Sequence, residues 1–131
     1  MRALNTKSRF DQAVIIMIAV AYCMNRFWLK KVVSNWTLSY LLNSHFNDWL
    51  AGISIVAYIN LILSKSKYTY IRIKNCWQAI VVCLCCGLLW EYVLPYLVQR
   101  GISDKWDVLA YILGGVTYIA LRVYFIMRSL Q

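Results

Sequence analysis

Four long apolar runs, at about 13–29, 49–63, 77–98 and 108–127, constrain this chain more than any other feature. Each is near the ~17–25 residues that a helix needs to cross a hydrocarbon core about 30 Å thick, and each is nearly free of charge. A single strand could not satisfy its backbone polar groups in lipid, so the runs are expected to be helices. The sequence therefore predicts an all-α integral membrane protein with four transmembrane helices in one domain, residues 1–131.

The composition supports this fold class. Of the 131 residues, 62% are hydrophobic, which argues against a soluble globular domain. The net charge of +9 would suggest nucleic acid as a partner of a soluble protein, but here the basic residues lie between apolar runs. In that position they set topology and contact anionic headgroups. Membrane lipids are the expected partners and nucleic acid is not, while a homo-oligomer or a partner membrane protein is left open.

The distribution of Lys and Arg predicts that both termini are cytoplasmic, in a multi-pass protein of the cell membrane. Nine of the fourteen basic residues fall on the side of the termini and the middle loop, and five fall on the other side. The nine are Arg2, Lys7, Arg9, Lys65, Lys67, Arg72, Lys74, Arg122 and Arg128, and the five are Arg26, Lys30, Lys31, Arg100 and Lys105.

The stretch at about 32–46 is too polar to span a membrane. Val33, Trp36, Tyr40 and Leu41 would form one apolar face of a helix. The pattern predicts a short interfacial or re-entrant helix, with an irregular outer loop as the alternative.

Four of the five acidic residues fall at the membrane face opposite the termini. They are Asp48, Glu91, Asp104 and Asp107, and they share that face with His45 and Asn47. Glu91 lies about seven residues before the end of the third run, roughly 10 Å deep at 1.5 Å per residue. Asp11, the remaining acid, is expected on the cytoplasmic side, outside the runs.

Helix capping accounts for some of these acids. Asp104 can be an N-cap with Asp107 at the third helical position, and Asn47 or Asp48 can cap the second helix. Capping does not account for Glu91, because it lies in the C-terminal half of its helix, where the dipole disfavours a negative charge. An ionisable group at that depth is costly unless it is paired or protonated, so Glu91 is the main functional candidate.

Pro95 adds a second feature to the same helix. Because proline has no N–H, the carbonyl of Glu91 loses its helical partner, and the sequence predicts a kink there. Trp90, Tyr92 and Tyr96 can supply a stacking wall or hydroxyl donors, although such aromatics also collect at membrane interfaces. Together these residues predict a polar, ligand-binding pocket that opens to the outer leaflet.

The small residues favour a packing role. Cys83 and Cys86 form a C-x-x-C pair within a span, where buried thiols react poorly. With His45 as the only histidine and the thiols on the opposite side, no zinc site is expected. Ala110 and Gly114 form a small-x-x-x-small pair that lets helices approach closely.

Three segments resemble a known family. "HFNDWLAG" (45–52), "WEYVLP" (90–95) and "SDKWDVLAYILGG" (103–115) have the spacing of VanZ-like membrane proteins and their small uncharacterised relatives, over about half of the chain, 45–118. The family residues that carry over are Glu91, Asp104, Asp107, Gly114 and Gly115, and Asn47–Asp48 fits the small relatives.

This sequence departs from VanZ proper near the acidic residue, since Gln99 and Arg100 come later than that family would place a Gln and an Arg. The resemblance implies a cell-envelope setting and an association with resistance to glycopeptide antibiotics, especially teicoplanin. It implies no particular chemistry.

Three functions fit these features. The first is binding of a polar or cationic ligand, such as a lipid headgroup or an amphipathic antibiotic, in the acidic pocket. The second is a metal-dependent enzyme acting on a phosphorylated lipid, with the four acids and His45 around Mg²⁺ or Mn²⁺. The third is a small proton-coupled transporter that uses Glu91. The sequence favours the first, names no cofactor and does not decide whether any reaction is catalysed.

Overall fold

The computed structural model describes residues 2–29, 32, 37, 40, 44–99 and 104–128. In this part of the chain four helical segments are long and apolar enough to cross a membrane, which confirms the predicted all-α class. Most of the interfacial helix expected at about 32–46 lies outside the described residues.

The helices extend further than the apolar runs. In chain order they are α1 (Arg2–Met24), the π-helical turn η1 (Asn25–Leu29), α4 (Phe46–Lys65), the 3₁₀ turn η2 (Thr69–Ile71), α5 (Cys76–Leu88), the π-helical turn η3 (Leu89–Val93), α6 (Leu94–Val98) and α7 (Lys105–Arg128). An apolar run marks only the part of a helix that lacks charged residues. The predicted segments were therefore too short wherever a helix begins with polar residues. This matters most in α1, where Asp11 lies inside the helix.

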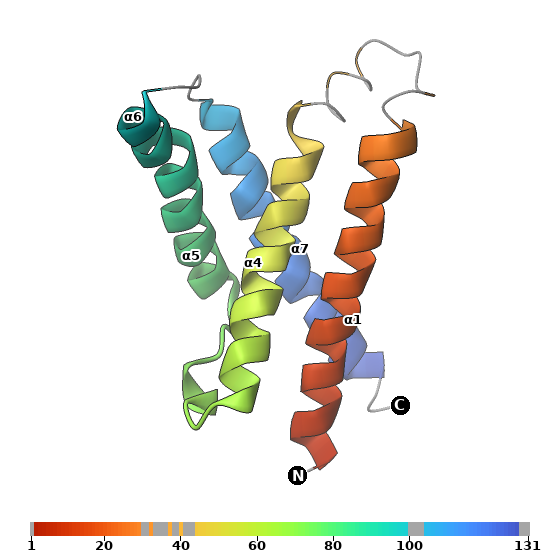
Figure 1. The fold of residues 1–131 in the computed structure, drawn as a ribbon. Coiled ribbons are helices and arrows are strands. Elements are labelled where there is room, and N and C mark those ends of the chain that lie inside the picture. The colour runs from red at the N-terminus through yellow and green to blue at the C-terminus, as the bar shows by residue number, and fades with distance from the viewer. Residues whose placement is uncertain are drawn as a thin grey trace.

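The two ends of the bundle carry different polar groups (Figure 1). One end, here called the termini end, holds the start of α1, the end of α7 and the connection between α4 and α5. The opposite end, here called the acidic end, holds the starts of α4 and α7 together with η3 and α6.

Helices α4 and α7 cross in close contact, with α7 passing behind α4 in Figure 1. Gly52 and Gly114 lie at the crossing. A Cβ atom added to Gly114 would overlap the carbonyl oxygen of Trp49 and lie 2.9 Å from the Ile53 nitrogen, and one added to Gly52 would overlap the carbonyl oxygen of Tyr111. The backbones therefore touch directly, as the small-residue pattern predicts.

Gly115, the next residue of α7, lies at the contact with α5. A Cβ atom on Gly115 would lie 2.5 Å from the Cys83 sulfur and 3.3 Å from the Ala79 carbonyl oxygen. Cys83 is fully buried, and its thiol is 3.7 Å from the Gly52 carbonyl oxygen. Adjacent glycines thus let α7 contact α4 on one side and α5 on the other.

The structure accommodates Pro95 by widening the preceding turn. The N–H of Leu94 bonds to the carbonyl oxygen of Leu89, five residues back, and Leu89–Val93 is π-helical. Such a turn moves backbone bonds away from the position where proline cannot donate. Glu91 lies in the middle of this turn. The sequence predicted a kink at this residue, and the structure has a π-helical turn there.

We expect Gly114→Ala to destabilise the fold by about 1–3 kcal/mol, because the new methyl group would enter the α4 backbone. Gly87→Ala is the matched control, since its Cβ atom would meet only Val108 and Tyr111, at 3.3 Å or more. Thermal unfolding of both variants in nanodiscs measures the difference. Equal stability of the two variants would contradict the close crossing.

Candidate functional site

A histidine and an aspartate from different helices form the centre of the acidic end. His45 directly precedes α4, Asp107 lies in the first turn of α7, and His45 Nδ1 is 2.6 Å from Asp107 Oδ1. Both side chains keep about a fifth of their surface exposed. Because the positive end of the α7 dipole favours a carboxylate here, both helix and imidazole support the charge of Asp107.

Asp48 adds a second carboxyl group from the first turn of α4. It lies close enough to Asp107, Glu91 and Tyr111 to interact with all three. Asp48 lies one helical turn before Gly52, and Tyr111 lies just before Gly114. The close crossing of α4 and α7 therefore places these two side chains together.

Glu91 adds a third carboxyl group, from η3. Its side chain is half-buried, accepts a hydrogen bond from the backbone of Asp104 and interacts electrostatically with Asp107. Three separate segments of the chain thus contribute carboxyl groups to one place. The cluster of Asp48, Glu91 and Asp107 with His45 is here called the carboxylate cluster.

Asp104 has the capping role that the sequence predicts. Its Oδ1 accepts a hydrogen bond of 2.9 Å from the backbone N–H of Trp106 in the first turn of α7. Asp104 also lies beside His45 and Asp107, and one potential ligand atom from each of the three lies within 4.8 Å of the others. This triad has the donor types that hold a divalent cation.

The other predicted site residues, Asn47, Trp90 and Tyr92, do not belong to the carboxylate cluster. The side chain of Asn47 accepts a hydrogen bond of 2.9 Å from Asn25 of η1, so it joins two helices. Trp90 and Tyr92 are largely exposed on η3. Neither Asn47 nor Asp48 is the N-cap of α4, because His45 holds that position. Asp48 lies in the first turn, where it meets the positive end of the helix dipole as predicted.

A second polar cluster, which the sequence analysis did not predict, lies buried toward the termini end. Asp11 of α1 is fully buried and accepts hydrogen bonds of 2.5 Å from Arg72 Nη2 and from the hydroxyl of Tyr118. Asp11 precedes the first apolar run but lies inside α1, which begins at Arg2. The carboxylate joins α1 to α7 and to the segment between α4 and α5.

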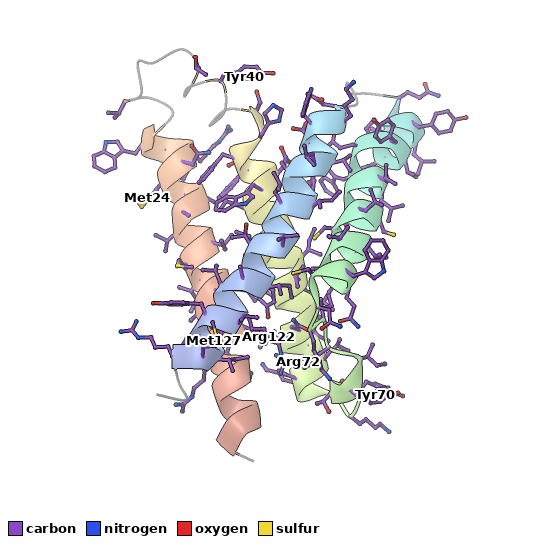
Figure 2. All side chains as sticks on the ribbon, turned by 180° about the vertical axis from the view of Figure 1, so that it is seen from behind. Met24, Tyr40, Tyr70, Arg72, Arg122 and Met127 are labelled. Atoms are coloured by element: carbon purple, nitrogen blue, oxygen red, sulfur yellow. The ribbon has the colours of Figure 1, made fainter. Side chains whose placement is uncertain are left out.

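The same cluster extends through Asn60 and Arg122. The Asn60 amide donates to Tyr118 and to the Ile73 carbonyl oxygen, both at 3.0 Å, and its oxygen accepts from the Ile73 N–H at 2.8 Å. Arg122 Nη1 donates to the same Ile73 carbonyl. Figure 2 shows Arg72 and Arg122 close together in the lower part of the bundle.

Two of the nine basic residues that the sequence places on the termini side are buried. Arg72 and Arg122 are 3% and 7% exposed, and both lie toward the termini end. Among the described residues, Nε and Nη1 of Arg72 have no hydrogen-bond partner. Asp11 is therefore the group that compensates the charge of this buried guanidinium. The pair holds α1 against the segment between α4 and α5.

Two signals in the sequence could have revealed this second cluster. Asn60 and Arg122 both stand inside predicted spans, where polar side chains need partners. Asp11 lies only two residues before the first run, so extending the helix by one turn would have brought it inside. No sequence signal pairs Asp11 with Arg72, because 61 residues separate them and Arg72 lies in a connection.

Comparisons with known proteins identify no relative: no family model, no curated protein and no solved structure matches this chain. The resemblance to VanZ-like proteins stays a prediction, and the site is interpreted from its own chemistry.

We expect Asp11→Asn to destabilise the protein by about 3–5 kcal/mol, because it leaves the buried charge of Arg72 uncompensated. Lys74→Gln is the control, since it removes a charge from an exposed residue of the same connection. Thermal unfolding in nanodiscs measures both. If Asp11→Asn unfolds no more easily than Lys74→Gln, the buried ion pair does not hold the termini end together.

Proposed function

We propose that this chain is a small multi-pass protein of the cell membrane, with both termini cytoplasmic, that binds a polar or cationic ligand at the carboxylate cluster. The convergence of Asp48, Glu91 and Asp107 from three separate segments is the observation that carries this proposal. Like charges at short range repel, so such a cluster is stabilised by protonation or by a bound cation.

The surroundings of Asp48 favour a cation supplied from outside the protein. The charged groups that act on Asp48 among the described residues are other carboxylates, Asp107 and Glu91. At the same end, the ion pair among the described residues is that of His45 with Asp107. A positively charged ligand would therefore replace repulsion between carboxylates with attraction.

The predicted VanZ-like resemblance agrees with such a site, because it rests on Glu91, Asp104 and Asp107, which the fold gathers at one end. On that resemblance the ligand would be met in the cell envelope, as a lipid headgroup or an amphipathic antibiotic.

We expect wild-type protein to retain a specific ligand that Glu91→Gln loses, because the variant removes one of the carboxylates from the cluster. Native mass spectrometry of the detergent-purified proteins, with extraction of bound lipid, measures this. Lys74→Gln is the control, because Lys74 is exposed at the opposite end of the bundle, and this variant should retain the ligand. Identical ligand profiles for wild type and Glu91→Gln would contradict a binding site at Glu91.

A second candidate function, metal-dependent chemistry on a phosphorylated lipid, is favoured by one observation. The triad of His45, Asp104 and Asp107 brings three potential ligand atoms within 4.8 Å of one another. One imidazole and two carboxylates suit Mn²⁺ or a similar divalent ion. Such an ion would bind phosphate oxygens and polarise them.

If this triad binds a metal, His45→Ala should weaken Mn²⁺ binding by at least about tenfold, as the loss of a ligand or even of an outer-shell partner does. Electron paramagnetic resonance of Mn²⁺ titrated into the nanodisc-embedded protein measures free and bound ion. Asn47→Ala, two residues away and paired with Asn25, is the control. If the wild type and His45→Ala bind Mn²⁺ equally, these three residues do not form a metal site.

A further inference from the structure

An apolar groove runs between α4 and α5, next to the carboxylate cluster. It has a volume of about 360 Å³ and is lined by Ala51, Ile55, Cys86, Leu89, Trp90 and Tyr111. One wall comes from α4 and the other from the end of α5 and from η3, with Tyr111 of α7 contributing to the lining. Leu88, Leu89 and Val93 near it are exposed apolar side chains, so the groove opens onto a surface that would face lipid.

Tyr111 connects the groove to the carboxylate cluster. Its hydroxyl contacts Asp48, while the same side chain lines the groove. Trp90, which also lines the groove, directly precedes Glu91 in the chain. Ala51 and Ile55 follow Asp48 by about one and two helical turns, so the groove extends roughly 10 Å from the cluster along α4.

We propose that the ligand of this site is a bilayer lipid whose headgroup ends in a primary ammonium group, with an acyl chain lying in the groove. This inference rests on the proposed function and names its ligand class. The ammonium group would lie among Asp48, Glu91 and Asp107, where its three N–H donors meet carboxylate acceptors. The chain would run from the cluster into the membrane, in the direction that lipid chains take.

Charge complementarity selects this groove over its neighbour. A groove of about 410 Å³ between α1 and α4 has a similar apolar lining, and its polar lining residues are Tyr22, Asn47 and Ser54. It lacks a residue such as Tyr111 that links its lining to Asp48. Lipid tails are as apolar as the groove, so the chain alone gains little by leaving the bilayer. The headgroup must therefore supply the preference, and the carboxylates lie beside the α4–α5 groove.

Photocrosslinking in nanodiscs tests this assignment. Two probes carry the same mid-chain diazirine, one on phosphatidylethanolamine and the other on phosphatidylglycerol. We expect the ethanolamine probe to label the groove segments of α4 and α5 about tenfold more than the glycerol probe, as one charge-assisted hydrogen bond would produce. Asp48→Asn should remove the preference, and the groove between α1 and α4 should show none.

Two cysteine variants test the chain site separately. Cys86 lines the groove, whereas its neighbour Cys85 is exposed and does not. Cys86→Leu should displace the label from the groove, and Cys85→Leu should leave it in place. Equal labelling by the two lipids, or labelling that both cysteine variants leave unchanged, would overturn the proposal.

Binding of ethylammonium, a cation without a long chain, separates this failure from failure of the proposed function. If ethylammonium binds in a manner that requires Asp48 while the lipid probes show no preference, the cation site stands and the lipid assignment falls. If neither ethylammonium nor the ethanolamine probe binds, both fall.

Discussion

The close crossing of α4 and α7 determines where every polar cluster of this protein lies. Gly52 and Gly114 bring the two backbones into contact, and the helices leave that point in both directions. One turn before Gly52 is Asp48, and seven residues before Gly114 is Asp107, which meet at the acidic end. Beyond the crossing, Asn60 and Tyr118 meet toward the termini end. One contact between small residues therefore sets the register of both clusters.

The two clusters differ in a way that separates structure from function. Toward the termini end, Arg72 pairs with Asp11 and Arg122 with the Ile73 carbonyl, and Asp11, Asn60 and Tyr118 are fully buried. At the acidic end the carboxyl groups are partly exposed and lie beside one another. A buried network of opposite charges and hydrogen bonds stabilises one arrangement of helices. A cluster of like charges at a surface stores unfavourable free energy that a ligand can relieve.

The sequence predicted the helices and the grouping of acidic residues at one end, but not the buried cluster around Asp11. Apolar runs reveal segments that cross lipid, and Asp104 beside a run reveals a cap, since both patterns are local in the chain. Asp11 and Arg72 could not be paired, because their contact depends on how α1 lies against α4 and α7. The triad of His45 with Asp104 and Asp107 likewise depends on the crossing. The π-helical turn at Glu91 was predicted only as a kink, since the pattern around Pro95 does not specify how the backbone adapts.

The claim that three helical segments form a single cation site is tested most directly by a double-mutant cycle. The affinity for methylammonium would be measured in nanodiscs for wild type, Asp48→Asn, Glu91→Gln and the double variant. A single shared site predicts a strongly non-additive result, in which the second substitution costs less than the same substitution made alone, with a coupling above about 0.5 kcal/mol. Losses that add within that margin would show that Asp48 and Glu91 act independently, and the account of one carboxylate cluster would be wrong.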